Sequence, residues 1–261
     1  MNLIRYAIVG AGGRMGRRII ALASTDPAFA CAAAIEPATS DLLGRDAGEL
    51  ASIGHSGVTL SDRLEAEFDV LIDFSTAAAT KTWLKVCRER PRPMVIGTTG
   101  HDESSIAAIR EASRDIAILQ APNMSVGVNL MLRLVEELAR ALDATYDVEI
   151  TETHHRFKMD APSGTAVALR DAVQKGRGGQ ANVTHGRQGQ TGQRPPGQIG
   201  VHSLRMGDTV GEHTVSFGGL GETISISHSA HSRDTFAAGA LRAAKWIIGK
   251  PAGLYGMSHA M

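Results

Sequence analysis

The chain is short of cysteine, of net charge and of long apolar runs, and each shortage excludes a class of protein. Its 261 residues include two cysteines, Cys31 and Cys87, which argues against a disulfide scaffold and favours a reducing compartment. Lys plus Arg equals Asp plus Glu at 27 each, so the formal net charge is zero. A nucleic-acid or membrane-surface partner would require a basic excess, and we expect neither.

Apolar runs are also short. No segment approaches the roughly 20 apolar residues of a membrane span. The apolar stretch within Met1–Gly10 is too short for a signal peptide. The sequence shows no internal repeat, and its length suits one large domain or two modest ones. We therefore expect a cytoplasmic protein.

The first half of the chain has the pattern of a nucleotide-binding unit. The apolar run Tyr6–Val9 is typical of a buried strand and ends in the glycine-rich turn Gly10–Gly16, and a helix is predicted over 17–24. Glycine permits a tight turn and a close approach of the backbone to a pyrophosphate, which the helix N-terminus then faces. The glycines follow the spacing Gly-x-x-Gly-x-x-Gly, because Met15 holds the sixth position.

A carboxylate follows this turn at a useful distance. The second predicted strand, Phe29–Ile35, ends in Glu36, 20 residues after Gly16. A carboxylate at that offset can accept hydrogen bonds from the ribose hydroxyls of the adenosine. The alternative interpretation is a solvated glutamate at a strand end.

Strands and helices continue to alternate, which predicts an α/β fold with a doubly wound parallel sheet. Ligands bind such sheets at the carboxyl ends of the strands. Polar or glycine-rich segments fall there at Glu36, Phe74–Ser75, Gly97–Gly100 and Ala121–Met124. The predicted elements are strands over 70–75, 94–96 and 116–119 and helices over 77–88 and 103–113.

The second half differs and predicts a smaller α+β domain with a mixed or antiparallel sheet. An amphipathic helix is expected over 128–142, and the Gly-, Gln- and Pro-rich residues 176–200 should form a long loop. A final alanine-rich helix over 235–248 could cap either domain. The other predicted elements are strands over 147–152, 199–206, 212–217 and 223–228 and a helix from about 165.

Four cationic or potentially cationic side chains crowd one loop of this half: His154, His155, Arg156 and Lys158. A helix start follows, with Ser163 as its predicted N-cap and with Gly164 and Thr165 in its first turn. Cations beside open backbone N–H groups suit a small, multiply charged anion. Histidine and lysine can also deliver a proton as general acids.

Each of these side chains has a simpler interpretation. His154 could be a structural histidine bonded to Glu152 or Asp160, and Lys158 and Arg156 could belong to a solvated run of charge. Asp160 is expected to brace the loop. The paired histidines could bind zinc, but neither cysteine nor a third histidine lies at ligand spacing, so no metal is expected.

With these motifs assembled, the chain closely resembles the dihydrodipicolinate reductase family, also called 4-hydroxy-tetrahydrodipicolinate reductase, of bacterial lysine and diaminopimelate synthesis. The resemblance spans almost the full length, and the basic loop is its most specific part. It implies a Rossmann-type domain of residues 1–126 and 233–261, completed by the last helix, and a substrate and tetramerisation domain of residues 127–232. The segments that carry it are Gly10–Gly16, Asp73–Ser75, Gly97–Gly100, Ala121–Gly127, His154–Ala166 and Gly207–His213.

The resemblance also implies roles for individual residues. His154 would be the proton donor or acceptor and Lys158 the proton donor, in a homotetrameric enzyme. His155, Gly164 and Thr165 would bind the substrate. The adenosine half of the cofactor would be held by Gly10, Ala11, Gly12, Gly13, Arg14, Met15 and Glu36, and its nicotinamide side by Gly97, Thr98, Thr99, Ala121, Pro122, Asn123 and Met124.

The implied reaction is reduction of a cyclic imine with two carboxylates by NADH or NADPH. Family members that use NADPH well often carry arginine after the ribose-binding acid, and here that residue is Pro37. Glu36 without an adjacent base should repel a 2′-phosphate, so we expect NADH to be favoured, although Arg14 and Arg17 could soften the preference. Two rivals stay open: an amino- or hydroxy-acid dehydrogenase that shares the first domain alone, and a non-catalytic nucleotide-sensing subunit.

Overall fold

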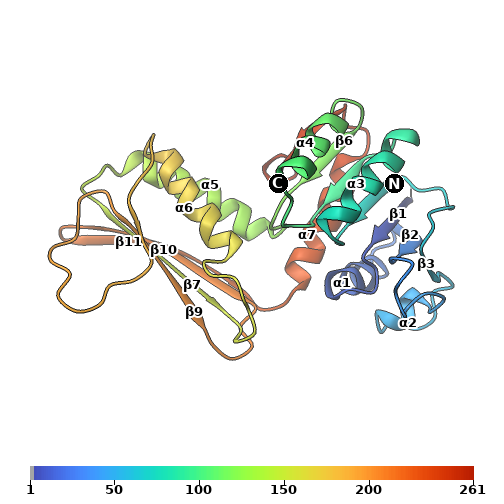
Figure 1. Cartoon of the computed structure of the whole chain (residues 1–261), viewed down its shortest axis with the longest axis horizontal. Helices are drawn as coiled ribbons and strands as arrows, with labels where there is room; N and C mark the ends of the chain where they lie inside the picture. The colour runs from blue at the N-terminus through green and yellow to red at the C-terminus, as the bar shows by residue number, and fades with distance from the viewer. Residues whose placement is uncertain (1–2) are drawn as a thin grey trace. The chain divides into compact units, whose positions relative to one another are not determined.

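The computed structural model describes residues 3–261, and the chain divides into two compact units (Figure 1). The first unit runs to Val126 and resumes at Arg233–Met261, and the second comprises Gly127–Ser232. The second unit is therefore inserted into the sequence of the first. Within residues 3–261, no helix has the length and apolar character needed to cross a membrane.

A seven-stranded sheet forms the centre of the first unit, and all of its strands run parallel. This confirms the predicted doubly wound sheet. The central strand β4 is wholly buried, as expected for a strand with helices on both faces. In spatial order the strands are β12 (Gly253–Tyr255), β6 (Ala117–Gln120), β5 (Met94–Ile96), β4 (Val70–Asp73), β1 (Ile4–Val9), β2 (Phe29–Ile35) and β3 (Leu60–Ser61).

Alternate side chains of these strands build two cores, one on each face of the sheet. Tyr6 and Ile8 of β1 pack with α1 (Arg14–Ala23) and α7 (Asp234–Ile247). Their neighbours in β1, Ala7 and Val9, pack on the other face with α3 (Ala77–Glu89) and α4 (Glu103–Ala112). This period of two is the geometry of a β-strand.

Several short elements were missed by the sequence prediction, and one helix start was placed too late. The helix α1 begins at Arg14 rather than at residue 17, because Gly13 is its N-cap. The missed elements are α2 (Ala47–Leu50), β3, β8 (Val183–Thr184), β12 and the 3₁₀ turn η1 (Met257–His259). Each has two to four residues, too few for a periodic pattern to develop.

The second unit has a mixed five-stranded sheet, as predicted. Strand β10 (Gly211–Gly219) is antiparallel to β7 (Asp147–His154) and to β11 (Glu222–Ala230), whereas β7 and β8 (Val183–Thr184) run parallel to β9 (Ile199–Arg205). The order is β11-β10-β7-β9-β8. One face of the sheet packs against α5 (Val126–Ala141) and α6 (Gly164–Gly176), which lie side by side in Figure 1.

The predicted loop of residues 176–200 overlaps the last residue of α6 and the first two of β9, contains the two-residue strand β8 and is irregular elsewhere. Two arginines attach it to β7. Arg187 donates to Glu149 Oε1 at 2.9 Å, and Arg194 donates to the carbonyl of Val148 at 2.8 Å. Ion pairs and backbone contacts therefore fasten the loop to the sheet, and Ala181 and Val183 add apolar contacts with the core of this unit.

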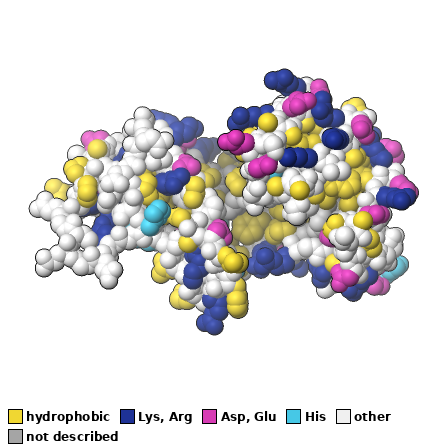
Figure 2. Space-filling model, viewed as in Figure 1, with side chains coloured by type: hydrophobic (Ala, Val, Ile, Leu, Met, Phe, Trp, Pro, Cys, Tyr) yellow, Lys and Arg dark blue, Asp and Glu magenta, His cyan; other side chains and the backbone are white. Residues whose placement is uncertain are grey.

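Charges of both signs lie close together on one face of the first unit. On the face shown in Figure 2, basic and acidic side chains are interspersed. Arg88, for example, pairs with both Asp115 and Glu111 at the surface. The formal balance of charge in the sequence is thus also a local balance on this face.

The final helix α7 belongs to the first unit, which settles the question that the residue pattern left open. Ala237, Ala240 and Ala244 of α7 are fully buried in the core that covers β1. Gly239 lies against the backbone after β6, where a Cβ atom would stand 1.7 Å from the carbonyl oxygen of Met124. The alanine-rich composition thus allows α7 to pack closely on the sheet.

Gly239→Ala is expected to destabilise the first unit. Alanine favours a helix over glycine by about 1 kcal/mol, but forcing a methyl group into a packed interior costs about 1–3 kcal/mol. Because the added methyl group would clash with backbone, the cost should lie at the upper end of this range of about 1–3 kcal/mol. The melting temperature should therefore fall by several degrees. Gly179→Ala is the control, because a Cβ there meets open space. A melting temperature at or above that of the parent would contradict this packing argument.

Candidate active site

A cavity of about 450 Å³ lies at the carboxyl edge of the first unit's sheet. Every residue predicted for the nicotinamide side of the cofactor is in its lining, together with three from the glycine turn. Phe74 and Ser75 were placed at a ligand-binding strand end by the sequence but were given no role with the cofactor, and Phe236 was not predicted at all. The lining comprises Gly13, Arg14, Met15, Phe74, Ser75, Gly97, Thr98, Thr99, Ala121, Pro122, Asn123, Met124 and Phe236.

Two glycines of the turn lie in close contact with the surrounding backbone. Gly10 has φ +77°, and a Cβ there would lie 2.4 Å from the carbonyl oxygen of Phe74. A Cβ at Gly16 would lie 2.2 Å from the carbonyl oxygen of Gly10, so this glycine lets α1 approach the turn. Four adenosine-side residues lie outside the cavity lining: Gly10, Ala11, Gly12 and Glu36. Ala11 is buried.

Glu36 is held against this turn. Its Oε1 accepts a hydrogen bond from the backbone N–H of Gly12 at 2.6 Å. A carboxylate anchored through one oxygen keeps acceptor sites on the other. Glu36 therefore sits where the sequence placed the ribose-binding acid, beside the glycine turn.

A buried aspartate supports two residues of the cavity lining, Ser75 and Thr98. Asp73, at the end of β4, accepts hydrogen bonds through Oδ1 from the backbone N–H and the hydroxyl of Ser75, and through Oδ2 from Thr80. The hydroxyl of Thr98 accepts from the same Ser75 N–H at 3.0 Å, and the Thr98 N–H donates to the Asp73 carbonyl. These bonds fix the segments after β4 and β5 relative to each other.

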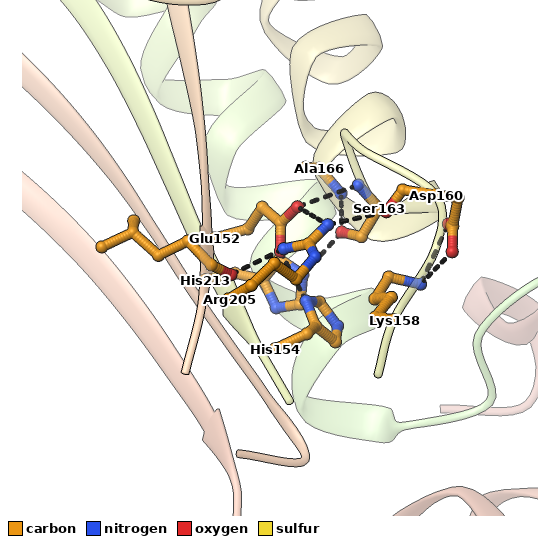
Figure 3. Close-up of polar contacts among 9 residues, drawn as sticks. Glu152, His154, Lys158, Asp160, Ser163, Ala166, Arg205 and His213 are labelled. Atoms are coloured by element: carbon orange, nitrogen blue, oxygen red, sulfur yellow. Dashed lines mark hydrogen bonds and ion pairs between the residues drawn. The ribbon is translucent and has the colours of Figure 1, made fainter. Parts of the chain in front are cut away.

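The basic loop occupies the second unit, between β7 and α6 (Figure 3). Strand β7 extends two residues beyond its predicted end and stops at His154. Ser163 is the N-cap of α6, as predicted, and its hydroxyl accepts from the N–H of Ala166 at 3.1 Å. The candidate substrate residues thus lie between a strand end and the open amides of a helix start.

The carboxylate of Glu152 is fully buried at the base of this loop. Arg205 from β9 donates to both of its oxygens at 3.0 Å, and His154 Nδ1 and the N–H of Ser163 donate at 2.5 and 3.1 Å. Burial acts to raise the pKa of Glu152, but the hydrogen bonds from Arg205 and His154 outweigh it and lower the pKa to about 2. The group is ionised at neutral pH.

His154 is held through one ring nitrogen. Because an ionised carboxylate can only accept, the Nδ1 bonded to Glu152 carries a proton. Among residues 3–261, Nε2 has no hydrogen-bond partner, and 12% of the side chain is exposed. Burial lowers the pKa of His154, Glu152 opposes that shift, and the charge of Lys158 adds to it. The hydrogen bond to Glu152 is the one expected if His154 is a structural histidine. It leaves Nε2 available for a hydrogen bond or for proton transfer.

A second histidine supports the first. His213 from β10 packs edge-on against His154 with ring centroids 5.2 Å apart, and its Nε2 lies 3.2 Å from the Ser163 hydroxyl. Burial, followed by the proximity of His154, lowers the pKa of His213 to about 4. A neutral imidazole at this position can pack against His154 without adding charge.

Lys158 extends from the middle of the loop. Its Nζ donates to both oxygens of Asp160, at 2.8 and 2.9 Å, and this hydrogen bond is the main reason that the pKa of Asp160 is lowered. The Lys158 side chain is 20% exposed. Asp160 therefore braces the loop as expected, while Arg156 lies exposed to solvent.

The predicted substrate-binding residues lie in the same segment. His155 is half-buried, and its Nδ1 has no hydrogen-bond partner among the described residues. Gly164 is exposed with open space around the position of a Cβ, and Thr165 follows it in the first turn of α6. The segment combines imidazole, ammonium and helix amide donors, which is a set suited to binding carboxylates.

A metal centre has no support in this region. Among residues 3–261, no three His, Cys, Asp or Glu side chains lie close enough to hold a metal ion. The buried acid Glu152 is satisfied by Arg205 and by N–H donors instead.

Two family models match the chain. The N-terminal model of dihydrodipicolinate reductase matches residues 4–124, and the C-terminal model of the same enzyme matches residues 127–261. Together they leave few residues outside the match.

Solved structures share the fold over nearly the whole chain. Dipicolinate-bound dihydrodipicolinate reductase from Paenisporosarcina sp. TG-14 is 24% identical, covers 99% of each chain and superposes with a TM-score of 0.77. Amine dehydrogenase from Mycobacterium smegmatis is 12% identical, covers 98% of this chain and 95% of its own, and has a TM-score of 0.67. GenD2 from gentamicin A biosynthesis, in complex with NAD, is 14% identical, covers 100% of this chain and 90% of its own, and has a TM-score of 0.59.

The neighbours at these identities establish the fold, and the family models establish the family. The first unit is a Rossmann-type nucleotide-binding fold and supports the use of NAD(P)H. The chain belongs to the dihydrodipicolinate reductase family and is an NAD(P)H-dependent oxidoreductase of lysine biosynthesis.

Proposed function

We propose that the enzyme reduces 4-hydroxy-tetrahydrodipicolinate, also named dihydrodipicolinate, to tetrahydrodipicolinate for lysine and diaminopimelate synthesis. The observation that carries this proposal is the single segment in which His154 Nε2, Lys158 and the amides of α6 are presented together. The dipicolinate bound by the neighbouring reductase supports a small dicarboxylate as the ligand.

The two carboxylates of the substrate would take different partners. The backbone N–H groups at Gly164 and Thr165, with the Thr165 hydroxyl, would bind one carboxylate at the helix N-terminus. His155 or Lys158 would bind the other. These donors orient the ring, and orientation of bound reactants is a large part of catalysis.

The reaction also needs a proton. Bound NAD(P)H supplies the hydride, and the chain must balance its negative charge. Lys158 would donate a proton, and its positive charge would also attract the dicarboxylate substrate. His154, whose Nδ1 is engaged by Glu152, can give or take a proton through Nε2.

The cofactor would be held by the first unit. Gly10–Met15 and Glu36 would hold the adenosine half at the glycine turn. Gly97–Thr99 and Ala121–Met124 would hold the nicotinamide side in the cavity already described. The close backbone contact at Gly10 fits this role, because any side chain there would meet Phe74.

His154→Ala and Lys158→Ala are each expected to lower kcat by about 10²–10⁴-fold, the usual contribution of a positioned general acid. Both residues lie in the second unit, so the Kd for NADH should stay at the parent value. The measurement is loss of reduced-nicotinamide absorbance in the presence of the product of the preceding synthase.

Arg156→Ala is the matched control, since this cation is exposed in the same loop and should leave turnover unchanged. Parent turnover in both test variants would remove His154 and Lys158 from the mechanism. If the parent itself fails to oxidise either cofactor with this substrate, an amino- or hydroxy-acid dehydrogenase or a nucleotide-sensing subunit becomes the better interpretation.

We also propose that NADH is preferred. Glu36 is anchored at the glycine turn and is followed by Pro37, so a 2′-phosphate would approach a fixed carboxylate without an adjacent base. Arg14 lies in the cavity lining, whereas the Arg17 Nε donates to the carbonyl of Gly12 at 2.7 Å. This hydrogen bond holds part of the Arg17 guanidinium at the glycine turn, so fewer of its N–H groups are available to a 2′-phosphate.

The parent should bind NADH more tightly than NADPH, and Glu36→Ala should shift the ratio of the two Kd values toward NADPH by about tenfold, equivalent to about 1.4 kcal/mol. Fluorescence titration of each reduced cofactor measures this ratio. Asp41→Asn removes a second carboxylate from the following loop and should preserve the ratio. Tighter binding of NADPH by the parent would contradict the proposed role of Glu36.

The enzyme is further proposed to be a cytoplasmic homotetramer whose second units meet through their sheets. One face of this sheet packs on α5 and α6, while the other presents hydroxyls, with Thr214 bonded to Ser227 and Ser216 to Ser225. Strand β11 has nine residues and pairs with β10 on one side, and among residues 3–261 no strand pairs with its other side. Long exposed edges are normally covered. Both cysteines are free thiols, which supports a reducing location.

Sedimentation equilibrium should give the mass of four chains. Ser225→Lys with Ser227→Lys should yield smaller species, because charge on this face opposes sheet contact, whereas Thr25→Lys on the first unit should not. A monomeric parent at micromolar concentration would contradict the proposed assembly.

A further inference from the structure

We infer that Glu152 and Arg205 are positioning residues that fix the tautomer and the orientation of the His154 imidazole and tie it to the start of α6. The inference rests on the proposed role of His154. Neither residue was among the predicted site residues, and neither is assigned a contact with substrate or cofactor.

The acceptor sites of Glu152 are fully used. Oε2 accepts from His154 Nδ1 at 2.5 Å and from Arg205 Nη1 at 3.0 Å. Oε1 accepts from the N–H of Ser163 at 3.1 Å and from Arg205 Nη2 at 3.0 Å. An ionised carboxylate has no proton to give, so the imidazole must carry its proton on Nδ1 and present the lone pair of Nε2 when neutral.

The same carboxylate fixes both ends of the basic loop. His154 begins the loop and Ser163 ends it, and both donate to Glu152. Arg205 also donates to the carbonyl of Asp160 at 2.6 Å, in the second half of the loop. As Figure 3 shows, these side chains come from β7, β9 and the start of α6 and converge on one point. The distance from the proton-transfer group to the anion-binding amides therefore depends on one buried ion pair.

The charges around His154 act in opposite directions. Glu152 raises its pKa, whereas Lys158 and Arg205 lower it. His213 faces the ring edge and is itself shifted toward the neutral form, mainly by burial. Removing Glu152 should consequently lower the pKa of His154, and removing Arg205 should raise it.

Glu152→Gln tests the inference directly. The glutamine amide can donate as well as accept, so His154 is no longer required to carry its proton on Nδ1. The substitution also removes the negative charge that favours the protonated, imidazolium form of His154. Histidine-selective ¹⁵N NMR should show a lower pKa for His154 and a mixture of tautomers, with the resonance assigned from His154→Ala. Turnover should fall by about 10²-fold, the lower end of what a positioned general acid contributes, while the Kd for NADH stays at the parent value.

Arg205→Gln should shift the same titration to higher pH, because it removes a cation and leaves the carboxylate ionised. A general loosening of the loop would not produce shifts of opposite sign. Glu152→Asp keeps the charge and should restore part of the turnover and the Nδ1–H tautomer.

Glu149→Gln is the matched control. Glu149 lies on the same strand, and its oxygens are 2.6 Å from His202 Nε2 and 2.9 Å from Arg187 Nη2. The variant therefore loses a comparable set of carboxylate contacts, with a histidine and an arginine, at a place away from His154. The His154 titration and tautomer should match those of the parent in this variant.

A His154 titration in Glu152→Gln that coincides with that of the parent would overturn the inference. If circular dichroism shows that Glu152→Gln does not fold, the test is the His154 pKa in Arg205→Gln. A pKa that is lowered or unchanged in that variant would overturn the inference. Failure of the proposed function is distinguishable: the parent would then not oxidise NADH with the substrate, although the tautomer and its shifts would still be observed.

Discussion

A carboxylate enclosed in the second unit determines how its basic loop is held. Glu152 is fully buried, and an isolated ion in such an environment would be strongly destabilising. It persists because Arg205 forms a two-pronged ion pair with it and because backbone and imidazole N–H groups supply the other bonds. Since these donors come from different segments, the loop between β7 and α6 cannot move without leaving a charge unpaired.

The first unit also holds a buried carboxylate through donors from different segments, but without a cation. Asp73 is also fully buried and is satisfied by the hydroxyls of Ser75 and Thr80 and by a backbone N–H. The two acids fix loops at strand ends, one beside the cavity of the first unit and one at the basic loop of the second unit. Polar networks that are completely satisfied specify one arrangement of the chain, which a site for oriented reactants requires.

Local patterns in the sequence were enough to predict the layers and the contiguous parts of the site. The bounds predicted for β2 and β5 coincide with those observed, because apolar runs between turn residues are strong signals. The pairing of Arg205 with Glu152 could not be predicted, since the parallel register of β7 and β9 is what sets Arg205 opposite His154. Likewise, Phe236 reaches the cavity from α7, far along the chain, without a motif of its own.

The inserted order of the two units has a consequence for biosynthesis on the ribosome. The face of the parallel sheet that bears Ile8 and Ile72 is covered by Ala237, Ala240 and Ile247, which are translated after the entire second unit. A nascent chain that has emerged as far as Ser232 has α1 on this face but leaves the part that α7 covers exposed, and it lacks the edge strand β12. Until the last segment is released, that face is a natural target for chaperones, and the nucleotide-binding half matures last although it is synthesised first.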